Sequence, residues 1–111
     1  MTYPEALGLT IAVEAPVYTV LLRLLAGAPW GRALLASVLV NLISHPLFTF
    51  VLLPWLDRAI RPVPALLVAE AMVVVIEAAL IYAWLRRRLA AVVGTALAAN
   101  WCSLVLGLLL G

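Results

Sequence analysis

The chain has 111 residues, 68% of them hydrophobic, with a mean hydropathy of +1.23 and a formal net charge of +2. Four apolar stretches of about 20 residues use nearly the whole length, which leaves no room for a soluble domain. Residues 1–111 should therefore form a single transmembrane domain. All seven cations are arginines at the ends of these stretches. That distribution reports membrane topology and argues against nucleic acid as a partner.

Four membrane helices are expected, each long enough to cross about 30 Å of hydrocarbon. They should cover residues 6–26, 33–53, 65–85 and 89–110. The connections should be a turn at 27–31, a longer polar segment at 54–64 and a tight turn at 86–88. Helices joined so closely must be antiparallel neighbours. The expected fold class is all-α, a polytopic membrane protein with four transmembrane helices.

The arginines also predict an orientation. The first and third connections, with the helix ends beside them, carry five arginines and no acid, whereas the second connection carries two arginines beside Asp57. By the positive-inside rule both termini should lie outside and these arginine-rich connections in the cytoplasm, in what we expect to be a bacterial inner membrane. Trp30, Trp55 and Trp84 fall at predicted helix ends, where interfacial aromatic residues belong, whereas Trp101 should pack between helices.

Polar residues mark an internal repeat in which a Glu is followed nine residues later by Arg, and farther along by an Asn-x-x-Ser motif. The markers are Glu14, Arg23, Asn41 and Ser44 in the first copy, and Glu77, Arg86, Asn100 and Ser103 in the second. Residues 6–53 and 65–110 would then be two repeated antiparallel hairpins with parallel topology, related by an axis along the membrane normal. Chance similarity between apolar segments is the alternative.

A layer of polar side chains is expected near the middle of the membrane. Its members are Glu14, Glu77, Asn41, Ser44, His45, Asn100 and Ser103, and Glu70 should lie nearer the outer surface. Glu70 and Glu77 are seven residues apart, so they share one helix face. No arginine is expected at this depth, and an ionisable group at the bilayer centre costs at least ~2.5 kcal/mol. Such groups tend to persist where a function or a partner compensates, and burial favours the neutral acid unless water or a cation reaches it.

The same stripes also suit helix association in lipid, because small side chains allow close approach and Asn can form hydrogen bonds between helices. Pro16 and Pro46 should each free a backbone carbonyl beside the polar layer, those of Ala12 and Leu42. Freed carbonyls recur where membrane proteins bind ions, but they can also accept hydrogen bonds from Ser or Asn side chains. Both interpretations of the polar layer stay open.

Other kinds of site find little support in the pattern. His45 with several carboxylates could ligate a divalent metal, but no recognised ligand spacing such as HExxH is present, so the metal stays unassigned and no cofactor is expected. Ser44 and His45 are adjacent and diverge by about 100° around a helix, so they cannot form a catalytic dyad with each other. No glycine-rich phosphate loop is present either. We therefore expect no enzyme.

Two resemblances bear on the chain. The run Asn41-Leu42-Ile43-Ser44-His45-Pro46, with Glu-Ala at 70–71 and 77–78 and Asn100-x-x-Ser103-x-x-x-Gly107, resembles a group of short uncharacterised bacterial four-helix membrane proteins. That resemblance spans most of the chain and implies no activity. In length, helix count and the position of Glu14, the chain also looks like a small multidrug resistance transporter. In that family the matching Glu exchanges protons for cationic drugs within a dimer, but the family's Gly-rich and aromatic later helices have no match here.

The leading hypothesis is cation- or proton-linked transport or channel activity by a protein embedded among membrane lipids. The predicted ion- or proton-binding residues are Glu14, Glu70, Glu77, Asn41, His45 and Asn100. The partners would be further copies of the chain or other membrane subunits. The alternative is a non-catalytic subunit or assembly factor of a larger membrane complex, in which the polar stripes serve only as helix contacts.

Overall fold

The computed structural model describes residues 2–86 and 88–110. Within these ranges the chain is helical, and it contains no strand. The elements are α1 (Tyr3–Ala26), α2 (Trp30–Leu47), the π-helical segment η1 (Phe48–Leu52), α3 (Leu53–Ala59), α4 (Pro62–Leu85) and α5 (Leu89–Leu110). Because α2, η1 and α3 follow one another without a break, they form one rod of 30 residues. Four rods are long and apolar enough to cross a membrane, which confirms the four predicted helices and a multi-pass membrane protein.

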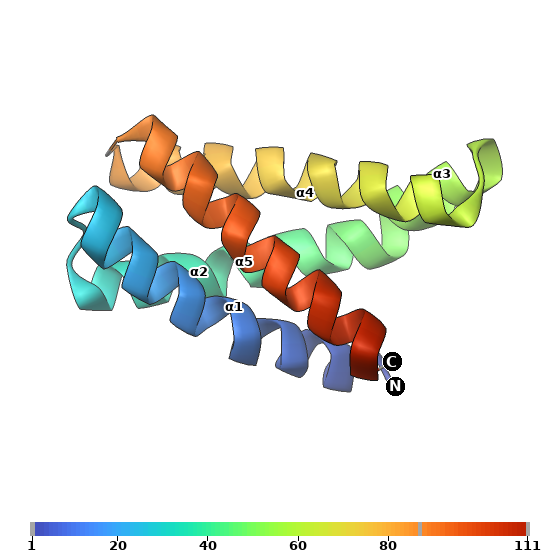
Figure 1. Ribbon diagram of the computed structural model, residues 1–111, viewed down its shortest axis with the longest axis horizontal. Coiled ribbons are helices and arrows are strands. Elements are labelled where there is room, and N and C mark those ends of the chain that lie inside the picture. Colours follow the sequence, from blue (N-terminus) through green and yellow to red (C-terminus); the bar gives the residue numbers. More distant parts are fainter. Residues whose placement is uncertain (1, 87, 111) are drawn as a thin grey trace.

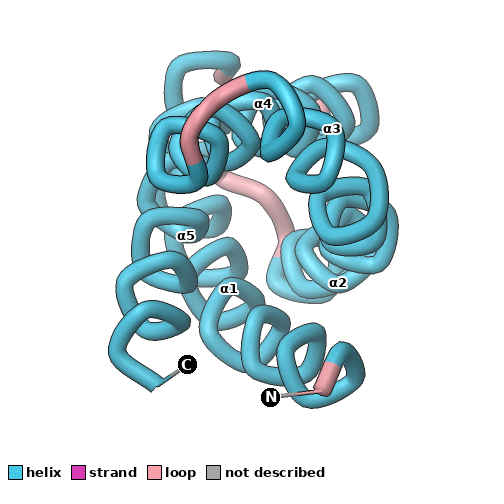
Figure 2. Tube along the Cα trace, turned by 90° about the vertical axis from the view of Figure 1, so that its right-hand side faces the viewer, coloured by secondary structure: helices cyan, strands magenta, loops and turns pink. Residues whose placement is uncertain are grey.

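The helices form a bundle in which α1 contacts α2 and α5, and α4 contacts the same two helices (Figures 1 and 2). The bundle measures 40 × 24 × 19 Å. Its two ends differ. We call the end that holds the connections after Ala26 and Leu85 the arginine end, and the end that holds both chain termini and the Ile60–Arg61 connection the terminal end (Figure 1).

The first turn is short because α1 ends in a tight hydrogen-bonded cap. Gly27 has a φ of 70°, in the left-handed region that favours glycine. The next residue, Ala28, donates its N–H to the carbonyl of Leu22 over 3.1 Å, which closes a Schellman motif. This cap lets α2 begin at Trp30, so residues 27–29 alone connect the two helices.

The long polar connection predicted over residues 54–64 is wrong. The helix continues through Pro54 to Ala59, and only Ile60 and Arg61 separate it from α4. The chain absorbs Pro54 by widening the preceding turn, where the N–H of Leu53 donates to the carbonyl of Phe48, five residues back instead of four. Pro54 then stands in the first turn of α3, where its missing N–H has little consequence.

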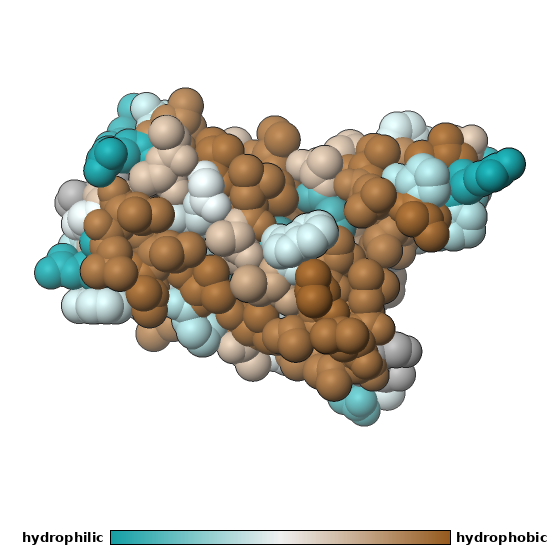
Figure 3. All heavy atoms as spheres, viewed as in Figure 1, coloured by the Kyte–Doolittle hydropathy of each residue, from teal (hydrophilic) through white to brown (hydrophobic). Residues whose placement is uncertain are grey.

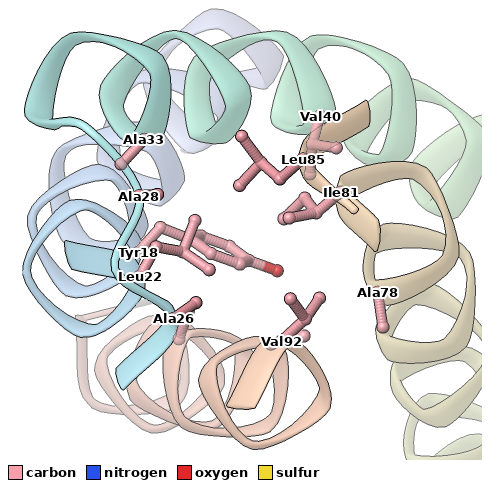
Figure 4. Close-up of a cluster of buried hydrophobic side chains, with 12 residues drawn as sticks. Tyr18, Leu22, Ala26, Ala28, Ala33, Val40, Ala78, Ile81, Leu85 and Val92 are labelled. Atoms are coloured by element: carbon pink, nitrogen blue, oxygen red, sulfur yellow. The ribbon is translucent and has the colours of Figure 1, made fainter. Parts of the chain in front are cut away.

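The main apolar core lies at the arginine end, where four helices contribute to one cluster of buried side chains (Figure 4). Tyr18, Leu22 and Ile81 are its largest fully buried members. Many of the others are alanines, which let the helix backbones approach closely. A second, smaller cluster joins α3 and η1 to the first half of α4 at the terminal end; it consists of Leu52, Leu56, Ala65, Ala69 and Val73.

The face shown in Figure 3 is mostly apolar, and its strongly hydrophilic residues lie mainly toward the ends of the bundle. This pattern suits a surface that faces lipid. The prediction that Trp101 packs between helices is wrong, because its side chain is 64% exposed on the outside of α5. The inward stripe of α5 is occupied instead by Ala96 and Asn100, and Trp101 lies one residue, about 100°, away from it.

Candidate ion-binding site

A cavity of about 220 Å³ lies between the helices. All six residues predicted from the sequence line it: Glu14, Glu70, Glu77, Asn41, His45 and Asn100. They come from α1, α2, α4 and α5, so the bundle brings together side chains that lie up to 86 positions apart in the chain. Their ion-binding role stays a prediction, whereas their convergence is a property of the fold.

The cavity extends toward the terminal end. Besides the polar residues, its wall includes Phe48, Leu66, Gly107 and Leu108, all of which lie in the terminal halves of their rods. Figure 3 shows the surface hollowed on that side of the molecule. Toward the arginine end the main apolar core fills the bundle, with the hydroxyl of Tyr18 pointing to its centre (Figure 4). The cavity therefore reaches the middle of the bundle from one end.

Glu77 is the most completely bonded group in the cavity. Its side chain is 1% exposed. Oε1 accepts a hydrogen bond from the hydroxyl of Tyr18 at 2.5 Å and another from Nδ2 of Asn100 at 2.8 Å, and Oε2 accepts one from the hydroxyl of Ser44. Three helices thus each provide one donor to a carboxyl group on the fourth.

Glu14 is equally buried but has far fewer partners. Its Oε2 accepts a hydrogen bond from the hydroxyl of Ser103 at 2.5 Å, whereas its Oε1 has no partner among the described residues. Across the same cavity the amide of Asn41 donates through Nδ2 to the carbonyl of Ser37 at 2.8 Å, and its Oδ1 is also buried without a partner. Each of these two side chains therefore keeps one buried acceptor oxygen without a donor among the described residues.

Glu70 and His45 lie at the edges of the site. Glu70 is only partly buried, and it also lines a second hollow between α4 and α5, next to Trp101. The ring of His45 packs against Tyr3, with 5.4 Å between the ring centroids, and Tyr3 in turn packs on Phe50 at 4.8 Å. The Nδ1 atom of His45 is buried without a hydrogen-bond partner.

The charge in the cavity is uncompensated. None of the described arginines lines it, and of the lining residues only His45 can carry a positive charge. The described arginines lie at the helix ends, where Arg32 stacks over the ring of Trp84 at 5.3 Å and Arg88 donates to the carbonyl of Leu25 at 3.0 Å. Within the described residues no group of three or more His, Cys, Asp or Glu side chains is placed to hold a metal ion. The arrangement suits protons or one small cation.

Two residues of the site were missed from the sequence. Tyr18 donates to Glu77, and Thr10 lines the cavity. Helical spacing could have identified both residues, because each lies four positions from Glu14 and so shares its helix face. The expected freed carbonyls of Ala12 and Leu42 accept no side-chain hydrogen bond in the described part of the chain. Ser and Asn donate instead to carbonyls one turn earlier on their own helices.

No known protein family, curated protein sequence or solved structure matches this chain. The two resemblances noted from short motifs stay predictions, and a function has to be argued from the site itself.

Proposed function

We propose that the protein moves protons or a small cation across the bacterial inner membrane through the carboxylate cavity, and that it is not an enzyme. The observation that carries this proposal is one cavity lined by Glu14, Glu70 and Glu77 with no arginine beside them. Buried carboxyl groups are costly in a membrane, and they mark proton relays and ion pathways in many transporters.

The shape of the cavity supports transport over a purely structural role. A polar layer that served only to hold helices together would pack without space, whereas this one borders an open cavity of about 220 Å³. A water molecule occupies about 30 Å³ in the liquid, so the cavity has room for several waters or for one partly hydrated ion. The cavity ends at the apolar core around Tyr18, Leu22 and Ile81. These side chains would have to move apart for an ion to leave at the arginine end.

The competing function is a non-catalytic subunit or assembly factor, and the surroundings of Glu77 favour it. Direct bonds from Tyr18, Ser44 and Asn100 tie four helices together and leave little of this carboxyl group for an ion. The exposed ring of Trp101 offers a contact for a further subunit or a second copy. In this alternative Glu14 would be the anomaly, because half of its carboxyl group has no partner.

The proposed internal repeat fits the same site. The repeat pairs Glu14 with Glu77 and Ser103 with Ser44. In the bundle, Ser103 of the second hairpin donates to Glu14 of the first, and Ser44 of the first donates to Glu77 of the second. Such a reciprocal exchange is what an axis between the hairpins along the membrane normal would produce. The repeat would place two related carboxylates in one layer.

The proposed orientation puts both termini and the mouth of the cavity outside and the arginine end in the cytoplasm. This orientation is supported by the uneven distribution of arginines along the sequence. In the bundle, Arg23, Arg32, Arg86 and Arg88 lie at one end. In this orientation the cavity would be filled from the outer side.

The transport proposal is tested by reconstituting the purified chain in liposomes with a pH-sensitive dye and imposing proton or alkali-cation gradients. We expect flux that falls to the level of empty liposomes in Glu14→Gln and in Glu77→Gln. Both changes keep shape and hydrogen-bonding capacity but remove the titratable charge. Glu5→Gln, at an exposed position of α1, is the matched control and should keep its flux. Full activity of both site variants would overturn the transport function and favour the structural one.

A further inference from the structure

We propose that the arginine end binds the phosphate group of an anionic membrane phospholipid through the guanidinium groups of Arg23, Arg32 and Arg88. This inference goes beyond the proposed function, because it concerns the opposite end of the bundle from the mouth of the cavity. It holds whether or not the cavity moves ions. It gives a partner to charged side chains that the carboxylate site does not use.

The arginine end carries positive charge that no acid of the protein balances. Four exposed arginines lie there: Arg23, Arg32, Arg86 and Arg88. The five acids of the chain lie elsewhere, three in the wall of the cavity and two toward the terminal end: Glu14, Glu70, Glu77, Glu5 and Asp57. The arginine end therefore has four described cations that require an anion from outside the chain.

Two of these arginines are oriented by tryptophan rings on neighbouring helices. The Cζ atom of Arg23 on α1 lies 5.8 Å from the centroid of the Trp30 ring on α2. Arg32 on α2 stacks in the same way over Trp84 on α4, at 5.3 Å. Both distances are within the range of cation–π attraction. Each guanidinium group is thus held between two helices without losing its charge.

The third arginine is held by a backbone atom. Arg88, just before α5, donates from Nη1 to the carbonyl of Leu25 on α1 at 3.0 Å. A guanidinium group has five N–H donors in one plane, so this bond leaves most of them free. The three contacts join α1 to α2, α2 to α4 and α5 to α1. The charged groups are therefore arranged around the end of the bundle.

Stacked guanidinium groups are suited to phosphate. Stacking uses the flat face of Arg23 and Arg32, and the N–H donors at the edge stay available. Two such donors can bind two phosphate oxygens at once, and bonds of this charged kind are stronger than neutral ones. Trp30 and Trp84 stand at helix ends, the depth at which tryptophan meets the headgroups of a bilayer. The phosphates of the membrane lie at this depth.

The surface beside the arginines favours a lipid over a free phosphate ion. Val20 lies three residues before Arg23, and Leu35 lies three residues after Arg32, so each is on the same helix face as its arginine, one turn deeper in the bundle. They are 42% and 48% exposed. The acyl chains of a phospholipid would cover these apolar side chains while its phosphate meets the arginines. A free phosphate would leave them uncovered.

Native mass spectrometry of the purified full chain in detergent, mixed with equal amounts of phosphatidylglycerol and phosphatidylcholine, tests the proposal. We expect the parent protein to retain phosphatidylglycerol preferentially. An arginine beside anionic lipid contributes about 1 kcal/mol, which is roughly fivefold in affinity. Arg23→Gln combined with Arg32→Gln should therefore weaken phosphatidylglycerol binding roughly 25-fold. The matched control, Arg58→Gln with Arg61→Gln, removes the same charge at the terminal end and should leave binding unchanged.

Two single variants distinguish a built site from diffuse attraction. Arg32→Lys keeps the charge but loses the planar fork, and Trp84→Leu removes only the stacking partner. Each should lower phosphatidylglycerol affinity several-fold, whereas Trp55→Leu, an exposed tryptophan of α3, is the control and should not. Circular dichroism checks that every variant keeps its helices.

Three results would overturn the proposal. The first is full preference for phosphatidylglycerol in the variant that lacks Arg23 and Arg32, or an equal loss in the variant that lacks Arg58 and Arg61. The second is full affinity in Arg32→Lys, which would leave diffuse attraction in place of a site. The third is displacement of the lipid by millimolar inorganic phosphate, which would identify a free phosphate as the ligand.

Discussion

The arginine end and the terminal end of the bundle are built from the same four rods, yet one is closed and the other is open. At the arginine end the rods meet through a core rich in alanine, including Ala26, Ala33 and Ala96. At the terminal end α3 packs with the first half of α4 in a separate cluster, apart from α1 (Figure 1). Small side chains at helix contacts bring backbones together. At the terminal end they join α3 to α4, through Ala65 and Ala69, and the cavity lies beside this cluster. A transporter needs both features, a seal and an accessible site.

We call the apolar core at the arginine end, around Tyr18, Leu22 and Ile81, the seal. Substitutions in the seal should lower stability more than substitutions elsewhere. Ile81→Ala removes a buried side chain from the closed end and leaves a void beside Tyr18 and Leu22. We expect the free energy of unfolding in mixed micelles to fall by roughly 2 to 4 kcal/mol. In liposomes carrying this variant, passive proton leak should rise above that of the parent protein. Val75→Ala, on the outward face of the same helix, is the control and should change stability by less than about 0.5 kcal/mol. Equal losses in the two variants would mean that no seal exists there.

Substitution of Glu77 should cause the second-largest loss of stability. Glu77→Leu leaves the donors of Tyr18, Ser44 and Asn100 without their acceptor. We expect a loss of about 1 to 3 kcal/mol in the same unfolding measurement, because unpaired buried donors are costly. Glu70→Leu, at the edge of the same cavity, removes a carboxyl group that makes no hydrogen bond to the described residues, and should be nearly neutral. If Glu77→Leu were as stable as Glu70→Leu, the polar contacts at mid-depth would not hold the bundle together.

The orientation of the two ends can be established with almost no disturbance of the protein. In a Cys102→Ser background, Ile60→Cys places a thiol at the terminal end and Gly31→Cys places one at the arginine end, where an added Cβ meets open space. Each change should shift stability by less than about 0.5 kcal/mol. An impermeant thiol reagent added outside intact cells should label Ile60→Cys alone. Labelling of Gly31→Cys from outside would reverse the proposed topology.

The helical spans and the composition of the cavity were predictable from local information. Runs of apolar residues long enough to cross a bilayer identify the spans, and the helical period of 3.6 residues places Glu70 with Glu77, and Asn41 with Ser44, on inward faces. Each of these inferences depends on residues a few positions apart in one helix. Tyr18 was accessible to the same argument, because it follows Glu14 by one turn.

The spacing of residues along one helix does not show which helices pack against each other. The long polar connection was wrong because Pro54 usually ends a helix, and here a wide turn at Phe48–Leu52 absorbs it. Trp101 was misplaced because the packing of α5 against α1 decides which side of α5 faces outward. The first error lies within one helix, whereas the second concerns a contact between distant segments.

The amino-acid sequence determined four spanning helices and a layer of carboxyl, amide and hydroxyl groups at mid-depth, because both follow from hydrophobic length and helical period. Only the tertiary structure decided that Glu77 receives three donors while Glu14 keeps an unpaired oxygen. The side chains that donate to Glu14 and Glu77 come from other helices, so their geometry depends on how the rods pack. The same packing leaves the cavity open at the terminal end and closed at the arginine end.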